Sequence, residues 1–415
     1  MSWATITNFE AAPFEIIDGD RGKNYPKQNE FSDSGYCLFL SATNVTRSGF
    51  EFSKCQFITE QKDEVLRKGK LQRDDVVLTT RGTIGNVAHF NASVNYEHMR
   101  LNSGMVIIRC NGEKIHPTYL YHFLRSPSFH GQVNSLKSGV AQPQLPIRDM
   151  RRIKMPLPPL PKQQTIAAIL SAYDDLIENN RRRIQLLEQA ARLLYKEWFV
   201  HLRFPGYEHA KIIDDVPEGW EKGCVGNLAD VKSGYAFKSK DWQQEGNPII
   251  KIKNLIGDGN VDIYNCDCVS DNVAGNASKY TIAEGTLLIA MTGATVGKVG
   301  IMPKNLRNFF LNQRVGQFTS KCHGSIETFL FPFFQGGFAQ TQVHNLAGGA
   351  AQPNISGSQI ESIELLIPEK KILAFYLDST KGIFCQRQNL LKQNEKLTQA
   401  RDLLLPRLMN GEVAV

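Results

Sequence analysis

The sequence predicts an α+β fold in which two pseudo-repeated α/β domains are separated by two long antiparallel, coiled-coil-like helices. Three observations predict this fold. A set of short motifs occurs twice in the same order, strand-like runs precede each long helical segment, and apolar side chains in those segments recur at steps of three and four. At 415 residues the chain is also longer than one ordinary domain core requires, which favours two or more domains.

The internal repeat is the strongest of these observations. Residues 141–144 (AQPQ) recur as residues 351–354 (AQPN), an offset of 210 (352 − 142). The turn-like residues 80–85 recur as residues 292–297, an offset of 212 (292 − 80). Because insertions in loops produce small drifts of this kind, the ordered matches indicate a tandem duplication.

Each copy begins with strand-like segments. Short β-branched runs between Gly, Asn and Asp clusters are typical of strands joined by turns. The predicted strands are residues 75–79 and 105–108 in copy one and residues 248–252 and 286–289 in copy two. A shorter helical pattern is embedded at residues 117–124, with residues 326–331 as its counterpart.

A long helix is predicted after each α/β domain. In the first helix, beyond the proline-rich break at residues 156–161, the apolar positions are Ile166, Ile169, Tyr173, Leu176, Leu187, Ala190 and Leu194. In the second helix they are Ile383, Leu390, Leu397 and Leu404. Both seams are interrupted by polar residues of the kind that fix the register of coiled coils: Asn180, Arg183, Arg387 and Asn394. Because each helix follows its own domain, we expect the two helices to pair antiparallel.

These patterns divide the chain into four segments. We place the first α/β domain at residues 1–154, the first helical region at 155–205, the second α/β domain at 206–366 and the second helical region at 367–415. A second break, at residues 204–220, is rich in Pro and Gly and separates the first helix from the second domain.

The composition is that of a soluble globular protein. Hydrophobic residues make up 42% and charged residues 21% of the chain, which excludes wholesale disorder. Neither a long apolar run nor a signal-peptide pattern is found, so we expect a cytoplasmic protein. Eight cysteines are scattered, and the pair Cys266 and Cys268 lacks the further ligands of a zinc site. We therefore expect reduced thiols and no metal.

No motif for catalysis is found. The nearest candidate for a phosphate-binding loop, residues 293–299 (GATVGKV), has three residues instead of four between its glycines and no Ser or Thr after its lysine. Its counterpart at residues 82–86 has no lysine, so we interpret both segments as turns between strands. The net charge of +7 permits binding to nucleic acid but does not establish it.

Several longer motifs are typical of one known family. Each strand-rich half ends in Ala-Gln-Pro and then Ile-x-x-Ile/Met-x-x-Pro before a long helix. The junctions and the end of the chain are residues 158–166 (PPLPKQQTI), 195–199 (YKEWF), 217–220 (PEGW) and 403–412 (LLLPRLMNGE). In this order the motifs resemble the specificity subunit of type I restriction–modification enzymes along the whole chain. The exception is residues 369–371 (EKK), which replace the Pro-x-x-Gln-Gln form of copy one.

The resemblance implies a non-catalytic subunit that recognises DNA. Its α/β domains would be target-recognition domains that lie on the two parts of an asymmetric, bipartite site. Its helices would act as a spacer and as the docking surface for two modification subunits, which methylate adenine at N6. ATP-driven restriction subunits would complete the complex. No cofactor is implied for this chain, because S-adenosylmethionine, ATP and Mg²⁺ would bind to the partner subunits, and no contact with a membrane is implied.

The candidate DNA contacts are cationic, amide and hydroxyl side chains in the loops of the repeat. Cations neutralise phosphates, Arg can read guanine, and Asn or Gln can read adenine through paired hydrogen bonds. In copy one the candidates are Thr80, Arg81, Thr83, Asn86, Arg100, Asn102, Ser103, Lys137, Gln142 and Gln144. In copy two they are Lys251, Lys253, Asn254, Thr292, Thr295, Lys298, Asn312, Gln313, Arg314, Gln352 and Asn354.

Comparison of the two copies divides these candidates. Residues that are identical in both copies cannot distinguish two different half-sites, so we assign them to scaffolding or phosphate contacts: Asn102 with Asn312, and Gln142 with Gln352. Residues that differ are the better candidates for reading bases: Arg81 against Gly293, Asn86 against Lys298, Ser103 against Gln313, Gly104 against Arg314, and Gln144 against Asn354.

Other interpretations stay open on the sequence alone. The loops could be polar only because they are solvated. The chain could be a coiled-coil adaptor with two protein-binding heads, or a stand-alone DNA-modifying enzyme with degenerate motifs. The basic run at residues 181–183 lies on the first long helix, where a solvated or partner-binding face is favoured over a nucleic-acid patch.

Overall fold

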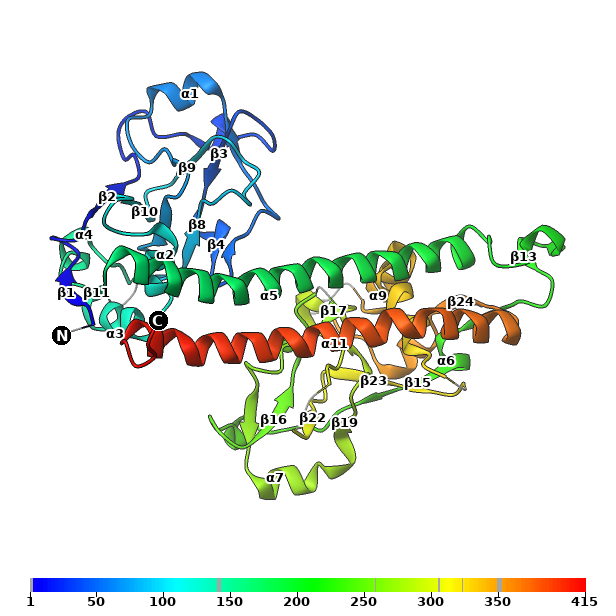
Figure 1. Cartoon of the computed structure of the whole chain (residues 1–415). Helices are drawn as coiled ribbons and strands as arrows, with labels where there is room; N and C mark the ends of the chain where they lie inside the picture. The colour runs from blue at the N-terminus through cyan, green and yellow to red at the C-terminus, as the bar shows by residue number, and fades with distance from the viewer. Residues whose placement is uncertain (1–2, 140–142, 258, 305–306, 323, 349–352) are drawn as a thin grey trace. The chain divides into compact units, whose positions relative to one another are not determined.

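The structure is a computed structural model that describes residues 3–139, 143–257, 259–304, 307–322, 324–348 and 353–415 (Figure 1). The chain forms two compact units. Unit 1 comprises Met1–Ile177 and Lys396–Val415, and unit 2 comprises Glu178–Glu395. Each unit holds one α/β domain and one half of each long helix. The units therefore cut across the four predicted segments, because each helix half packs into the core of the domain beside it.

The strands of unit 1 are short and form two small sheets and two isolated pairs. They are β1 (Thr5–Asn8), β2 (Phe14–Asp18), β3 (Cys37–Leu40), β4 (Val45–Thr46), β5 (Gly49–Phe50), β6 (Phe57–Ile58), β7 (Val76–Thr79), β8 (Val87–His89), β9 (Met99–Leu101), β10 (Met105–Cys110) and β11 (Lys154–Leu157). The sheets have the orders β2-β10-β7-β8 and β6-β3-β9, and the pairs are β1–β11 and β4–β5.

Most helices of unit 1 pack into the core on one face of the larger sheet, whereas the first lies beside the smaller sheet. The helices are α1 (Glu60–Val65), α2 (Pro117–Leu124), α3 (Pro127–Leu136), α4 (Ile147–Met150) and the first half of α5 (Leu160–Tyr195). Successive residues of a strand point to opposite faces. Val76 and Leu78 of β7 accordingly pack in one core with Phe123 and Phe129 of α2 and α3, whereas Val77 packs in a second core with β3. A strand that is buried on both faces reads as the continuous apolar run seen in the sequence.

Unit 2 repeats this plan with more strands. They are β12 (Ile212–Ile213), β13 (Val216–Pro217), β14 (Glu221–Cys224), β15 (Ala229–Ser233), β16 (Asn247–Ile250), β17 (Gly259–Asn260), β18 (Asp267–Val269), β19 (Thr281–Ile282), β20 (Leu287–Ala290), β21 (Val299–Ile301), β22 (Phe309–Leu311), β23 (Val315–Ser320) and β24 (Glu364–Ile367). Its sheets have the orders β15-β23-β20-β21-β17 and β18-β16-β22-β19, and β12–β13 and β14–β24 form separate pairs.

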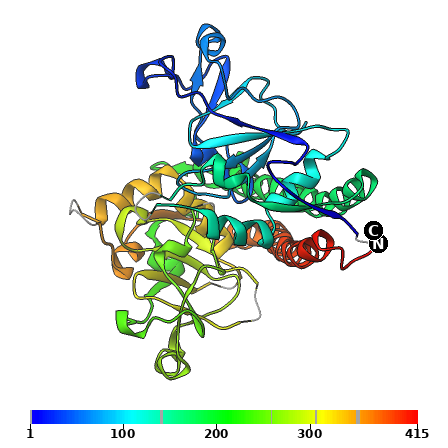
Figure 2. The same cartoon turned by 90° about the vertical axis from the view of Figure 1, so that its left-hand side faces the viewer.

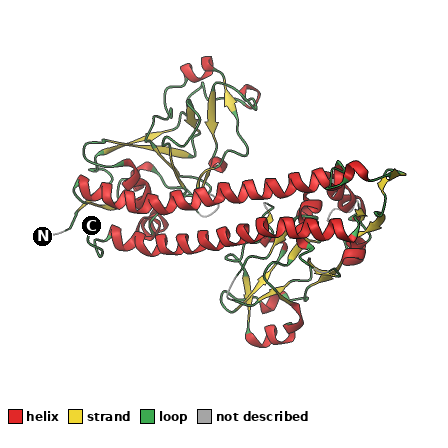
Figure 3. Ribbon diagram, turned by 45° about the vertical axis from the view of Figure 1, so that its right-hand side comes forward, coloured by secondary structure: helices red, strands yellow, loops and turns green. Residues whose placement is uncertain are grey.

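The helices of unit 2 match those of unit 1 at an offset of about 210, except for the first one, which has no helical counterpart in copy one. They are α6 (Val225–Leu228), α7 (Asp271–Asn276), α8 (Glu327–Gln335), α9 (Gly337–Leu346), α10 (Gly357–Glu361) and the first part of α11 (Lys370–Met409), with the second half of α5. Figure 3 distinguishes the short helices and strands of each copy from the two long helices. No helix among the described residues is long and apolar enough to cross a membrane.

The duplication is confirmed in individual contacts. In unit 1 Gln132 accepts from the Lys154 backbone N–H at 2.8 Å and donates to the Lys154 carbonyl at 2.9 Å. In unit 2 Gln342 makes the same two bonds with Glu364, both at 3.0 Å. Both residues are displaced by 210 (342 − 132 and 364 − 154), so the α3–β11 contact of copy one is rebuilt as the α9–β24 contact of copy two.

The predicted antiparallel pairing of the long helices is present in each unit. In unit 1 the Asp174 carboxylate of α5 accepts from Arg401 of α11 at 2.6 Å, and Leu170 shares a core with Leu408. The segments near the two ends of the chain also lie side by side in this unit (Figure 2). The ring of Trp3 is close to Gly411, where an added Cβ atom would clash with it.

In unit 2 the polar residues of the two helices pair with one another. Asn180 donates to the Asn394 side chain at 2.9 Å, and Glu188 accepts from Arg387 at 2.6 Å. The partner number on α11 falls as the α5 number rises, which is an antiparallel arrangement. Three of the four polar interruptions predicted from sequence therefore lie in the seam.

The predicted phase of the first seam is wrong in part. Ile166 is buried as predicted, but the buried residues that repeat every seven positions along α5 are Leu170, Ile177, Ile184 and Ala191, followed by Trp198 in the π-helical turn after α5 (Lys196–Val200). Leu176 is 51% exposed, and Ala190 and Arg183 are exposed as well. Apolar residues occupy both of the adjacent positions at 176 and 177 and at 190 and 191, so periodicity alone cannot choose between them. The polar pairs of unit 2 fix the choice.

Most of the other local predictions are confirmed. The helical pattern at residues 117–124 is α2, and the predicted strands correspond to β7, β10, β16 and β20 within two residues. The glycine-rich segment beginning at Gly293 is a turn between β20 and β21, with positive φ at Gly293 (76°) and Gly297 (83°). Its counterpart between β7 and β8 has φ of 70° at Gly82 and 91° at Gly85.

Candidate nucleic-acid interface

Three loops of copy one meet beside the ends of β7 and β9. The backbone N–H groups of Thr80 and Arg81 donate to the Gly104 carbonyl at 2.8 and 3.2 Å. The Leu145 N–H donates to the Thr80 carbonyl at 2.9 Å, and Arg81 forms an antiparallel bridge with Gln144. The structure therefore brings together three of the loops in which the sequence places candidate DNA contacts.

Copy two assembles the same three loops. The Met291 N–H donates to the Arg314 carbonyl at 3.0 Å, and the Ile355 N–H donates to the Met291 carbonyl at 2.9 Å. Thr292 forms an antiparallel bridge with Asn354, which corresponds to the bridge between Arg81 and Gln144. The predicted match of Arg81 with Gly293 is therefore wrong by one residue, because Arg81 corresponds to Thr292 and the extra residue of copy two lies later in the turn. Both copies thus present one backbone framework, on which the side chains differ.

The candidate side chains differ in their access to solvent. The exposed ones are Arg81, Thr83, Lys137 and Gln144 in copy one, and Lys253, Lys298, Gln313, Arg314 and Asn354 in copy two. The half-buried ones are Asn86, Asn102, Ser103, Lys251, Thr292 and Thr295. Gln142 and Gln352 lie outside the described residues.

Arg100 is buried, and burial favours a structural role for it over contact with DNA. Its guanidinium is ion-paired with Asp63 and donates to the backbone carbonyls of Asp63, Leu66 and Lys68 at 2.7 to 3.0 Å. It therefore ties α1 to β9. The matched position in copy two is Phe310 (310 − 100 = 210), so an apolar contact replaces the ion pair there.

Thr80 is also buried, and it turns inward to the loop framework. Its hydroxyl donates to the Gly104 carbonyl at 3.1 Å and its exposed fraction is 5%. The identical pair Asn102 and Asn312 holds the neighbouring turn in both copies. The Asn102 side chain accepts from the Gly104 N–H at 2.9 Å, and the Asn312 side chain accepts from the Arg314 N–H at 3.2 Å. These contacts support the scaffolding role assigned to the identical residues.

A further matched pair, Asn44 and Asn254, escaped the sequence comparison. Asn44 accepts from the Ser41 N–H at 2.9 Å and donates to the Glu51 carbonyl at 2.9 Å. Asn254 accepts from the Lys251 N–H at 3.0 Å and donates to the Asp262 carbonyl at 2.8 Å. The signal was available, since 254 − 44 is again 210, but one shared residue in a diverged loop is indistinguishable from chance. Asn254, a candidate DNA contact, is buried in this turn.

Lys251 and Lys253 form a local cluster around one carboxylate. Each donates to Asp267 at 2.9 Å, and the Lys251 ammonium lies 4.1 Å from the centre of the Trp242 ring. Burial opposes ionisation of Asp267, but the hydrogen bonds from both lysines outweigh it, and its pKa falls below the usual value. The cluster keeps one net positive charge beside the turn of Asn254.

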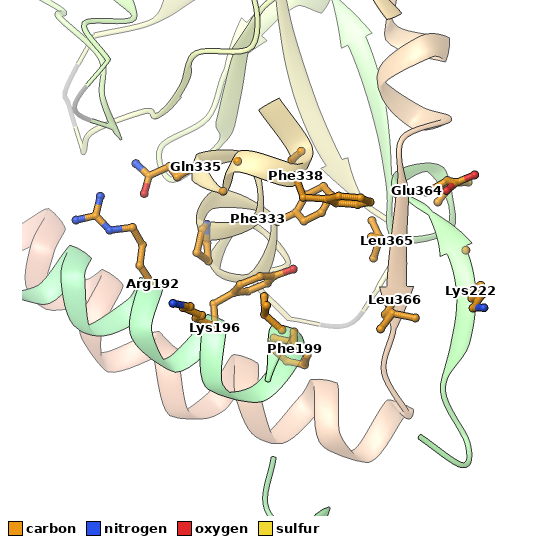
Figure 4. Close-up of a pocket in the computed structure, with 18 of the residues that line it drawn as sticks. Arg192, Lys196, Phe199, Lys222, Phe333, Gln335, Phe338, Glu364, Leu365 and Leu366 are labelled. Carbon is orange, nitrogen blue, oxygen red and sulfur yellow. The ribbon is translucent and has the colours of Figure 1, made fainter. Parts of the chain in front are cut away.

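Unit 2 also contains a cleft of about 1050 Å³, built from other elements. Figure 4 shows its walls, which come from the end of α5, the α8–α9 junction and strands β14 and β24. Phe333, Phe338 and Leu365 contribute apolar surface, and Arg192 and Lys196 contribute positive charge. Among the residues that the structure describes, no group of three or more His, Cys, Asp or Glu side chains is placed to hold a metal ion.

The fold and the paired loop frameworks define a two-domain class of protein with repeated recognition surfaces. The family model for the type I restriction modification DNA specificity domain matches residues 14–189 and again residues 217–389. The chain therefore belongs to the family of type I restriction enzyme specificity subunits. These subunits recognise DNA sequence within a complex, and catalysis lies in the partner subunits.

Individual relatives agree with this assignment. The MjaVIII specificity subunit of Methanocaldococcus jannaschii is 26% identical over 323 residues, which cover 76% of this chain and 74% of the relative. The HindI specificity subunit of Haemophilus influenzae is 22% identical and is aligned over 95% of this chain and 98% of its own length. The crystal structure of the type I S subunit from M. genitalium is similar in fold, with a TM-score of 0.56 at 16% identity, covering 98% of this chain and 96% of that one.

Proposed function

We propose that this specificity subunit binds a bipartite, asymmetric DNA site and that each α/β domain reads one half of it. One observation carries the proposal: the two copies hold the same backbone framework but present different exposed side chains on it. Arg81 and Gln144 occupy the positions that Thr292 and Asn354 occupy in copy two, and Arg314 occupies that of Gly104. A repeated backbone framework that presents different side chains in each copy is suited to two half-sites of different sequence.

The chemistry of these side chains suits direct readout. Arg81 and Arg314 are exposed and can offer two parallel N–H donors to guanine, while Gln144 and Asn354 can pair with adenine. Counting described residues only, the meeting loops of copy one have one exposed Arg and one exposed amide, and those of copy two have one exposed Arg and two exposed amides, Gln313 and Asn354. The Arg comes from a different loop in each copy. The order of contacts along the DNA would therefore differ between the half-sites.

We also propose that the long helices carry the docking surface for two modification subunits, with restriction subunits completing the complex. Leu186 and Leu193 of α5 are 64% and 54% exposed and are seven residues apart. Each follows a buried seam residue, Ile184 or Ala191, by two positions, which is about 200° around an α-helix. An exposed apolar stripe opposite a filled seam suits packing against a partner helix. S-adenosylmethionine, ATP and Mg²⁺ belong to the chemistry of those partners.

Mapping of N6-methyladenine in a host that expresses this chain with its modification subunits tests the proposal. The expected result is methylation at one two-part motif with a fixed gap and two different halves. Methylation at a single uninterrupted motif would contradict the division of recognition between the copies. A gel-shift assay at several salt concentrations distinguishes a DNA-binding subunit from a coiled-coil adaptor. A DNA-binding complex loses affinity for DNA as the salt concentration rises, whereas an adaptor gives no shift.

A further inference from the structure

Each copy places an exposed cation where its glycine turn meets the turn that follows Asn44 or Asn254, but from a different element. In copy one this is Arg47, in the turn between β4 and β5, three residues after Asn44. The residue three positions after Asn254 in copy two is Gly257, which has no side chain. The exposed cation of copy two is instead Lys298, from the turn between β20 and β21.

Lys298 lies over the position that corresponds to Arg47. A Cβ atom on Gly257 would fall 3.3 Å from Lys298 Nζ and 3.6 Å from its Cδ. The counterpart of Lys298 in copy one is Asn86, and its side chain donates to the Val45 carbonyl at 2.9 Å, two residues before Arg47. In both copies, therefore, the loop between β7 and β8, or between β20 and β21, contacts the turn that follows Asn44 or Asn254. Only the element that supplies the charge has changed.

The glycine turns themselves are in equivalent places. A Cβ atom on Gly85 would lie 3.1 Å from His130 Nδ1, and one on Gly297 would lie 2.9 Å from Gln340 Oε1. His130 and Gln340 are matched residues of α3 and α9 (340 − 130 = 210). Burial lowers the pKa of His130, and the charge of Arg47 lowers it further. The exchange of cations thus takes place at one point of a shared framework.

We propose that Arg47 and Lys298 are corresponding phosphate contacts for the two half-sites, an inference that rests on the proposed DNA-binding function. The charge at this point is retained while the shape of its carrier changes from a planar guanidinium to an ammonium. A phosphate requires the charge, whereas the edge of a base requires the planar geometry. Among the described residues, neither Arg47 nor Lys298 forms a salt bridge.

The test is the salt dependence of DNA binding by the full chain in complex with its modification subunits. The probes are a duplex with the mapped methylation motif and a duplex with that motif scrambled. Each neutralised phosphate contributes about 0.9 to the slope of log K against log salt. Arg47→Ala and Lys298→Ala should each lower the slope by about 0.9, so between 50 and 200 mM salt each variant should lose about 3.5-fold less affinity than the wild type. Both duplexes should be affected alike.

Two further variants control for charge and for folding. Arg182→Ala removes an exposed cation from α5 and should leave the slope unchanged. The double variant Arg47→Gly, Asn86→Lys rebuilds the copy-two arrangement in copy one and should restore the slope, with thermal unfolding used to confirm that it is folded. An unchanged slope in both alanine variants, or a change of preference at one half-site, would overturn the inference. If the wild-type complex itself does not prefer the motif duplex, the proposed function has failed instead.

Discussion

The buried ion pair of unit 2 gives the sharpest prediction for stability. Arg387 has an exposed fraction of 1%, and its Nε donates to Glu188, whose side chain is 9% exposed, at 2.6 Å. Its Nη2 donates to the Gly259 carbonyl at 2.8 Å and to the Asn260 side chain at 2.6 Å. One side chain therefore joins both long helices to the hairpin between Asn254 and Asp262, which contains β17.

Replacing Arg387 by Met removes the guanidinium but keeps most of the buried volume. The Glu188 carboxylate then stays buried without it, and breaking a buried pair in this way costs about 3–5 kcal/mol. Replacing Glu188 by Leu as well removes the remaining charge. The double variant should lose only the hairpin bonds, about 1 kcal/mol each. It should thus be more stable than Arg387→Met by about 1–3 kcal/mol.

Urea unfolding followed by tryptophan fluorescence measures these differences. Three of the four tryptophans, Trp198, Trp220 and Trp242, lie in unit 2, so the signal reports mainly on that unit. Arg387→Lys is the matched control, since it keeps the charge but cannot reach Glu188 and the hairpin with one planar group. A double variant no more stable than Arg387→Met, or a single variant within 1 kcal/mol of wild type, would refute the reasoning.

Four further predictions follow from other parts of the chain. Arg81→Ala should alter the preferred base at one half-site only, measured by methylation of a randomised library; an equal loss on all sequences would make Arg81 a phosphate contact. Arg100→Met should lower the stability of unit 1 by about 1–3 kcal/mol while leaving the methylated motif unchanged, because Asp63 loses its buried partner and keeps only the more exposed Lys70. Burial lowers the pKa of His122 to about 3, so below pH 6.5 the unfolded state binds a proton that the folded state does not. The free energy of unfolding should therefore be about 2 kcal/mol lower at pH 5 than it is above pH 6.5. His122→Gln should remove this pH dependence. Leu186→Glu with Leu193→Glu should reduce copurification of the modification subunits without changing the unfolding midpoint, and unchanged copurification would place docking elsewhere.

The duplication made much of the fold predictable from one sequence. Two copies of the same elements reinforce one another, and a strand buried on both faces, such as β7, is an unambiguous apolar run. The phase of the α5 seam was harder to predict from the sequence, because Leu176 and Ile177 are equally apolar. The choice between them depends on which polar residues, such as Asn180 and Asn394, find one another across the helix pair.

The candidate site was predicted at the level of loops more than of side chains. Arg81 and Arg100 are both arginines in turn-rich segments, yet one is exposed and the other is buried against Asp63. That difference arises from α1, which no local pattern near Arg100 reveals. The proposed phosphate contact Arg47 was not among the sequence candidates, because the residue at the same offset in copy two is Gly257 and comparison of the two copies gives no match there.

A domain exchange tests the central claim most directly. Residues 206–366 would be replaced by the corresponding domain of a specificity subunit with a different known motif, and N6-methyladenine would be mapped in a host that expresses the hybrid with its modification subunits. Our account predicts that one half of the methylated motif is retained and that the other half becomes that of the donor. Retention of the whole original motif, or replacement of both halves together, would contradict independent reading by the two copies.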